Sequence, residues 1–306
     1  MYTFTKNELG MFKSICDGHR SVTDLTSAAA MSTMSTYRIA HELSSKKVIM
    51  IRREGKRTLL VPSSHGHSKA LAEFLIGNGR MIDPLVGSRL LVLLSVSSNE
   101  KDLDVIAEET GLAVESVRRI VWSLKGYGIV RQERRRISVP QVDTALVRFL
   151  KDFSKGACAA VLEDKAPSGA VIWSEGLEFL FASREPVESP GIRETGITAM
   201  SQRGLQFISD TRYYHCAYWQ PRLRREDVAL HNLLVDPNSS RSISYSLLFL
   251  MKEGYNQGYL INRGEAVGVG GLSREIVRYL EGETVGNANF PTRKELDELR
   301  SQYGVD

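Results

Sequence analysis

Apolar residues in the first 140 positions fall into two sets that coincide when the sequence is shifted by 81 residues. Polar positions agree as well, because Ser21 coincides with Asp102 and Arg38 with Arg119. The ten apolar pairs at this offset are Leu9/Leu90, Phe12/Leu93, Ile15/Val96, Val22/Leu103, Leu25/Ile106, Met31/Leu112, Ile39/Ile120, Leu43/Leu124, Val48/Ile129 and Ile49/Val130. A set of matches at one fixed offset indicates an internal repeat.

The first copy predicts three helices followed by a β-hairpin. Leu9, Phe12 and Ile15 have helical spacing and predict the first helix. The second and third helices are expected over 21–30 and about 34–47, separated by a turn at 30–32. The β-branched run 48–51, the turn at 54–56 and the segment 58–61 then predict the hairpin.

The second copy predicts the same order of elements. Asp83 followed by Pro84 is a favourable start for its first helix, since proline suits the first helical position. The second helix is expected over 102–110 and the third over 114–126, and Gly111 suits a left-handed turn between them. Strands over 129–131 and 137–139 complete the copy.

Three helices followed by a two-stranded wing is the plan of the winged helix-turn-helix. The run LAVESVRRIVWSLKGYGIV, which begins at Leu112, resembles the recognition-helix region of bacterial and archaeal winged-helix regulators. The resemblance covers roughly the first 140 residues and is specific to a superfamily. It implies that the third helix of each copy enters the major groove of double-stranded DNA.

The outward faces of the third helices and the two wings supply the candidate DNA contacts. Arginine bidentate to guanine is the commonest specific base contact, so Arg38 and Arg119 are the first candidates for base reading. Basic wings suit phosphate or minor-groove contact. The predicted DNA-binding residues are Thr33, Ser35, Arg38, Arg52, Arg53, Lys56, Arg57, Ser116, Arg118, Arg119, Arg131, Arg134, Arg135 and Arg136.

Charge is distributed unevenly along the chain. The net charge is +4, but residues 1–140 carry 21 Lys/Arg against 14 Asp/Glu, whereas the remainder carries 19 against 22. A basic front half joined to a slightly acidic back half indicates that the front half binds a polyanion and the back half has another task.

Residues 142–306 predict a mixed α+β domain. A helix is expected over 143–162, followed by short strands and then by amphipathic helices. The predicted strands are 170–173, 177–182, 198–200, 205–209 and 213–219, and the predicted helices are 225–235, 242–252, 272–280 and 291–303. The glycine-rich run 264–271 lacks the spacing of a phosphate-binding loop and predicts a flexible turn.

No motif in this half indicates an enzyme. Glu226, Asp227 and Asp236 are interpreted as helix-capping or solvated carboxylates, and His215 with Cys216 as core or half-buried sheet residues. An aromatic cluster followed by arginines is interpreted as sheet packing with exposed arginines, and an interface or an acidic-ligand pocket remains the alternative. The cluster consists of Tyr213, Tyr214, Tyr218 and Trp219, followed by Arg222, Arg224 and Arg225.

Neither a metal nor another cofactor is predicted. Cys16, Cys158 and Cys216 form no CxxC pair and are interpreted as buried reduced thiols. His65 and His67 lie in a linker without further ligands nearby in sequence, so they are not interpreted as a zinc site. With no secretion signal and no apolar run long enough for a bilayer, we expect a cytoplasmic protein that does not contact membrane.

The sequence therefore predicts an α+β protein with two tandem winged helix-turn-helix domains, at 1–64 and 81–141, joined by a linker helix at 65–80. The C-terminal domain, 142–306, is expected to dimerise, sense a ligand or bind a protein partner. The predicted function is that of a sequence-specific transcription regulator, acting as a homodimer on double-stranded DNA. Two alternatives remain: a plasmid-type replication or maintenance protein, and an antitoxin or interaction adaptor that acts through the C-terminal domain. The latter rests on a layout similar to antitoxins of the abortive-infection type.

Overall fold

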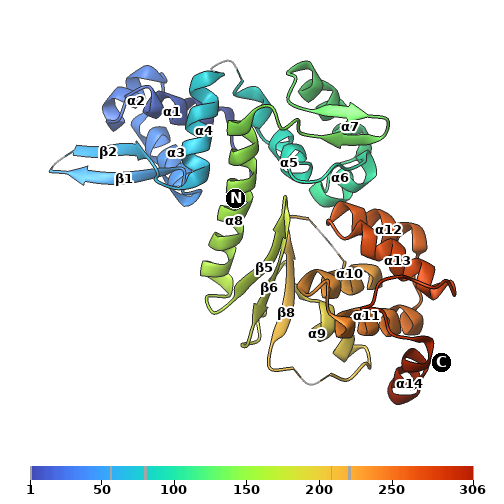
Figure 1. Ribbon diagram of the computed structural model, residues 1–306. Helices are drawn as coiled ribbons and strands as arrows, with labels where there is room; N and C mark the ends of the chain where they lie inside the picture. Colours follow the sequence, from blue (N-terminus) through green and yellow to red (C-terminus); the bar gives the residue numbers. More distant parts are fainter. Residues whose placement is uncertain (1, 56, 79–80, 208, 220–221, 306) are drawn as a thin grey trace. The chain divides into compact units, whose positions relative to one another are not determined.

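A computed structural model describes residues 2–55, 57–78, 81–207, 209–219 and 222–305 of the chain (Figure 1). It confirms the predicted mixed α+β class. The chain divides into two compact units, Met1–Ala160 and Val161–Asp306, each described separately below. The division falls within helix α8 (Thr144–Lys165).

The first repeat of unit 1 contains three helices and one hairpin, as expected. Polar side chains begin each helix, since Thr5, Ser21 and Ser32 accept a backbone N–H from the first turn. The hairpin is antiparallel (Figure 1), and its register places Ile49 opposite Pro62. The elements are α1 (Lys6–Cys16), α2 (Val22–Ala28), α3 (Thr33–Ser45), β1 (Ile49–Glu54) and β2 (Arg57–Pro62).

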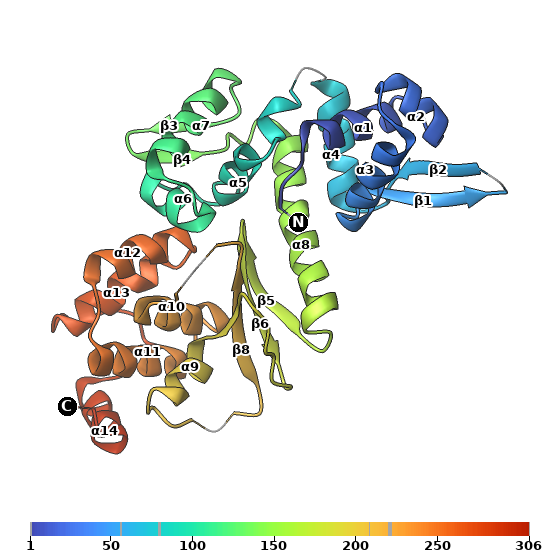
Figure 2. The same ribbon diagram turned by 180° about the vertical axis from the view of Figure 1, so that it is seen from behind.

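The second repeat has the same order, but its first helix begins later than predicted. Asp83 and Pro84 form a short 3₁₀ turn, η1 (Asp83–Leu85), and the α-helix begins only after Gly87, whose φ is +58°. Gly111 adopts the predicted left-handed conformation with φ +69°. The other elements are α5 (Ser88–Ser95), α6 (Leu103–Thr110), α7 (Val114–Gly126), β3 (Arg131–Glu133) and β4 (Arg136–Ser138), which Figure 2 shows from behind.

Equivalent backbone contacts tie each hairpin to the segment before its second helix. In the first repeat the N–H of Leu60 donates to the carbonyl of Arg20 over 2.8 Å. In the second repeat the N–H of Ile137 donates to the carbonyl of Lys101, also over 2.8 Å. Arg20 and Lys101 are 81 residues apart, whereas Leu60 and Ile137 are 77 apart, because the second hairpin is shorter.

Helices α4 (Gly66–Gly77) and α8 complete unit 1. The rings of Phe4 and Phe153 have centroids 5.2 Å apart, and Phe149 stacks on Phe153 at 5.4 Å. Nε2 of His67, in α4, lies 3.1 Å from the carbonyl oxygen of Lys46. These buried contacts connect the N-terminal strand-like segment, α4 and the first part of α8.

Unit 2 contains a four-stranded antiparallel sheet with the strand order β5-β6-β8-β7. Helices α9 and α10 lie beside the sheet, and the remaining helices pack around α10 and α11 (Figure 2). The strands are β5 (Ala170–Glu175), β6 (Glu178–Ser183), β7 (Ile192–Glu194) and β8 (Arg212–Ala217). The helices are α9 (Gly196–Gln202), α10 (Arg225–Val235), α11 (Ser240–Glu253), α12 (Gln257–Ala266), α13 (Gly270–Leu280) and α14 (Arg293–Tyr303).

Several elements of unit 2 differ from the sequence prediction. Residues 198–200 lie in helix α9 instead of a strand, and the described part of 205–209 forms no strand. Strand β7 lies between the predicted strands 177–182 and 198–200, where no strand was predicted. The turn predicted over 264–271 is confined to residues 267–269, because Gly264 lies in α12 and Gly270 begins α13. A Cβ on Gly264 would stand 2.4 Å from Oγ of Ser273, so this glycine permits close helix packing.

Candidate nucleic-acid interface and a buried polar cluster

The third helix of the first repeat, α3, presents a mixed polar and apolar face. Thr33 and Arg38 are exposed, as predicted, and Ser35 is half-buried. The backbone N–H of Ser35 donates to Oγ of Ser32, whose hydroxyl donates in turn to Oγ of Ser35 over 2.9 Å. Ser35 is thus part of the helix cap, and Arg38 is the exposed arginine of this face.

The third helix of the second repeat, α7, presents more positive charge. Arg118 and Arg119 are exposed and Ser116 is half-buried. Arg118 forms an exposed ion pair with Glu115 one turn earlier, and Arg119 lies 3.4 Å from Oγ of Ser116. Exposed pairs of this kind contribute little free energy, so both guanidinium groups can exchange these partners for a ligand.

Hairpin β1–β2 carries exposed arginines on both of its faces. Arg52 and Arg53 are neighbours in β1, and successive side chains of a strand point to opposite faces. Arg57, at the start of β2, is exposed as well. Lys56, a predicted contact, lies outside the described residues. One flat surface laid against the hairpin therefore reaches Arg52 or Arg53, but not both.

Hairpin β3–β4 concentrates its positive charge at the turn. Arg134, with φ +53°, and Arg135 occupy the turn and are both exposed. Arg131 pairs with Glu133 on the same strand, and Arg136 is half-buried. The four predicted arginines are therefore not equivalent, and Arg134 and Arg135 have the greatest reach.

Large apolar side chains are also exposed on both third helices, which the sequence did not reveal. Met34 on α3 is 83% exposed and Trp122 on α7 is 79% exposed. Single exposed apolar residues are common on protein surfaces, so neither by itself defines a binding site. Met34 lies in the first turn of α3 and Trp122 in the second half of α7, and each is four residues from an exposed arginine, Arg38 or Arg118.

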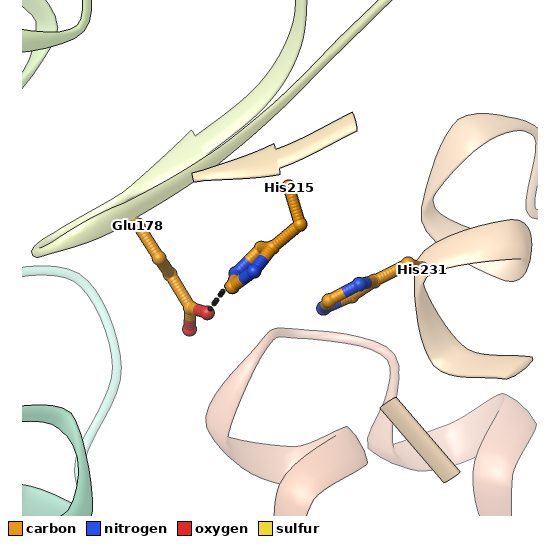
Figure 3. A group of neighbouring side chains, drawn as sticks. All are labelled: Glu178, His215 and His231. Carbon is orange, nitrogen blue, oxygen red and sulfur yellow. Dashed lines mark hydrogen bonds and ion pairs between the residues drawn. The ribbon is translucent and has the colours of Figure 1, made fainter. Parts of the chain in front are cut away.

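A buried polar cluster in unit 2 brings together residues that no sequence motif connected. Glu178 from β6, His215 from β8 and His231 from α10 point toward one another (Figure 3). Nε2 of His215 lies 2.9 Å from Oε2 of Glu178, and the two imidazole rings stack with centroids 4.5 Å apart. His231 Nδ1 lies 2.8 Å from the hydroxyl oxygen of the fully buried Thr195.

Arg263 from α12 links this cluster to a second buried carboxylate. Its guanidinium donates to Oε2 of Glu178 over 2.6 Å and to Oδ1 of Asp227 over 3.3 Å. Asp227 also accepts the hydroxyl of Tyr259 at 3.0 Å and the backbone N–H of Arg224 at 2.9 Å. Asp227 does cap its helix, but the expectation that solvation accounts for Asp227 and Glu226 is wrong, since both are buried.

Burial dominates the electrostatics of His231. The pKa of His231 lies well below the ordinary value of 6.5, because burial and the neighbouring His215 and Arg263 all disfavour the imidazolium. Glu178 opposes this shift. His231 is therefore a neutral imidazole near pH 7, with Nε2 buried and without a hydrogen-bond partner among the described residues.

The aromatic and arginine-rich segment around β8 is divided between core and surface. Tyr214 is buried and stacks on Phe181 with ring centroids 5.1 Å apart, as expected for sheet packing. Tyr218 and Trp219 are about half exposed, and the guanidinium of Arg224 lies 4.1 Å from the ring centroid of Tyr259.

The three cysteines carry no disulfide, and burial raises the pKa of Cys16 and Cys216 to about 11. Cys158 is fully buried, while the other two are only partly covered. His65 bonds to Oγ of Ser63 through Nδ1 over 2.6 Å, and burial lowers the pKa of His67. His65 and His67 thus both take part in local hydrogen bonds of unit 1.

Comparison with known proteins classifies only the C-terminal part of the chain. A family model described as HVO_2833_C, C-terminal, matches residues 189–305, which is less than half of the chain. No curated protein and no solved structure matches. Among the described residues, no helix combines the length and the apolar character needed to cross a membrane.

Proposed function

We propose that the protein is a sequence-specific regulator of transcription that binds double-stranded DNA through two winged helix-turn-helix domains in unit 1. The proposal rests on one repeated observation. In both repeats, a third helix with exposed arginine is followed directly by a hairpin with exposed arginines. A helix for base edges and a basic wing for phosphates are the two contacts that such a domain needs.

The second repeat carries the more complete set of candidate DNA contacts. Arg118 and Arg119 lie on the outward face of α7, and Arg134 and Arg135 occupy the turn of the following hairpin. In this arrangement Arg119 reads a base, while the turn arginines neutralise phosphates. Two such repeats in one chain read two half-sites, and a homodimer in the cytoplasm would read a palindrome of them.

The direct test measures binding of the full chain to a random duplex library at two salt concentrations. Selection should enrich one sequence motif, and affinity should fall steeply with salt because phosphate contacts release counterions. The variant Arg134→Ala/Arg135→Ala should bind the enriched duplex more weakly by about tenfold or more at the higher salt.

The matched control is Lys151→Ala/Lys155→Ala, which removes the same charge from exposed positions on α8. This control should bind the duplex as the wild type does. No duplex binding at low salt would refute the proposal. Equal weakening by both variants would show that the loss reflects net charge and not a specific contact of the hairpin turn with DNA.

A second function is favoured by the exposed Met34 and Trp122. Apolar side chains on the third helices suit docking of a protein partner, as in the adaptor or antitoxin alternative. Under that function, Trp122→Ala would abolish capture of the partner, while duplex binding would be absent in the wild type. The library experiment separates the two functions because only the regulator enriches a motif.

A further inference from the structure

The donor atoms of Glu178, His215 and His231 have the spacing of a metal site. One atom from each lies within 4.8 Å of those of the other two, and all three residues are buried (Figure 3). Two imidazoles bound to one zinc ion through bonds of about 2.0–2.1 Å hold their ring centroids roughly 5 Å apart. The centroids of His215 and His231 are 4.5 Å apart, so small side-chain rotations suffice to share one ion.

The surroundings of His231 point to a ligand at its second ring nitrogen. Nε2 is buried and has no hydrogen-bond partner among the described residues, although buried polar atoms are normally satisfied. Nδ1 lies 2.8 Å from the hydroxyl of Thr195. When Nδ1 carries the ring proton and donates it to Thr195, Nε2 presents its lone pair to the cluster. This is how metal-binding histidines are usually oriented.

We propose that Glu178, His215 and His231 bind a divalent transition-metal ion, and that Zn²⁺ fits this donor set best. Two imidazole nitrogens and one carboxylate oxygen are ligands that zinc prefers, and water or another group completes the coordination. Because the ligands come from β6, β8 and α10, the ion would join the sheet to the helical part of unit 2.

The charge around the cluster is compatible with a cation. Glu178 and Asp227 are two buried carboxylates, and Arg263 is the guanidinium that contacts both of them. The formal charges of these three groups sum to one negative charge, which favours a dication. Glu178 must keep Arg263 on one carboxylate oxygen while the other binds the ion. In the competing outcome, Arg263 alone neutralises the buried carboxylates and the cluster binds no metal ion.

The test is a titration of the full chain with Zn²⁺ after dialysis against a chelator. The proposal predicts one equivalent bound with a Kd of about 1 µM or tighter. His231→Gln should weaken binding at least about 100-fold, and Thr195→Val about 10- to 100-fold, because the threonine orients the ligand. The matched control is His67→Gln, since His67 is also buried but lies in unit 1.

Substitution with Co²⁺ in the wild-type chain provides a second measurement that does not depend on a variant folding. The bound ion should show the visible absorption of low-coordinate cobalt without a thiolate charge-transfer band, since the cluster contains no cysteine. Absence of stoichiometric binding, a thiolate band, or unchanged affinity in a folded His231→Gln variant would overturn the proposal. None of these outcomes depends on whether the protein binds DNA.

Discussion

The two repeats of unit 1 share a core plan but differ in the charge of their third helices. The outward side of α7 carries Arg118 and Arg119, whereas the corresponding part of α3 carries Arg38 beside the exposed Met34. The buried positions match at the 81-residue offset, and the exposed ones mostly do not. The comparison shows that the shared buried positions accompany the same order of elements, while the exposed residues that would contact a ligand differ between the two copies.

The repeats also differ in how each accommodates one buried ion pair. In the first, Lys46 pairs with Glu8, which accepts the N–H of Thr5 as well. In the second, Lys101 contacts both carboxylate oxygens of Glu109 at 2.9–3.0 Å, and Ser95 donates to the same group. The two pairs do not occupy equivalent positions at the 81-residue offset, so the buried ion pair is not part of the repeated pattern.

The largest effect is expected when the buried pair of the second repeat is broken. Lys101→Ala leaves the carboxylate of Glu109 buried without its cation, which costs about 3–5 kcal/mol in the free energy of unfolding. Urea unfolding followed by circular dichroism measures this change. Lys46→Ala should cost less, because Lys46 is only half-buried and contacts one carboxylate oxygen of Glu8, whereas Lys101 is buried and contacts both oxygens of Glu109.

The control is the double variant Lys101→Met/Glu109→Leu, which removes both charges and should recover most of the lost stability. A loss below about 1 kcal/mol for Lys101→Ala would mean that water reaches Glu109 and that the pair is not a buried one.

Where local pattern is strong, the sequence predicts these elements well. The bounds of α7 and α10 agree with the prediction to the residue, because each has regular apolar spacing. The strand prediction for residues 198–200 was wrong because three residues carry little periodicity. The segment is helical and packs against α10. The predicted helix start at Asp83 and Pro84 was wrong because a proline start signal cannot distinguish a 3₁₀ turn from an α-helix.

The candidate sites, too, could be predicted only where they depend on local sequence pattern. Exposed arginines on α7 and in the hairpin turn followed from the amphipathic pattern, since the apolar side had to face the core. The buried cluster could not be predicted, because Glu178 and Arg263 are 85 residues apart and meet only through the fold. No spacing between Glu178, His215 and His231 corresponds to a metal-binding motif, so only their positions on neighbouring elements reveal the cluster.

A smaller effect should separate the third helices as readers of bases. Arg119→Ala should weaken binding of the selected duplex by about 1–3 kcal/mol and relax the preference at one base position. Arg38→Ala tests the equivalent position of the first repeat. Competition binding against single-base variants of the duplex measures both. Equal relaxation by the two variants would show that both repeats read bases.

If the second repeat reads bases alone, Arg38→Ala changes affinity uniformly across the duplex variants. Arg119→Lys is the informative companion, because lysine keeps the charge but not the planar, bidentate guanidinium. Full recovery by lysine would assign Arg119 to a phosphate instead of a base.

The wings should differ in the salt dependence of binding by a still smaller amount per residue. Each phosphate contact contributes about 0.9 to the slope of log affinity against log salt. Arg134→Ala/Arg135→Ala should therefore lower the slope by about 2, since both residues occupy one turn. Arg52→Ala/Arg53→Ala should lower it by about 1, because these neighbours face opposite sides of β1. Affinities measured across a salt series decide this, and equal slopes for the two variants would contradict the geometric argument.

The smallest effect is expected from Trp122→Ala. The side chain is 79% exposed in α7, so its removal should change the free energy of unfolding by less than about 0.5 kcal/mol. Trp122 also lies one helical turn beyond Arg118, away from the N-terminal end that faces base edges in this class of domain, so duplex affinity should hardly fall. Urea unfolding and duplex titration of the same preparation measure both quantities. A loss of affinity larger than that of Arg119→Ala would place the C-terminal half of α7 against DNA and reverse the assignment of its two ends.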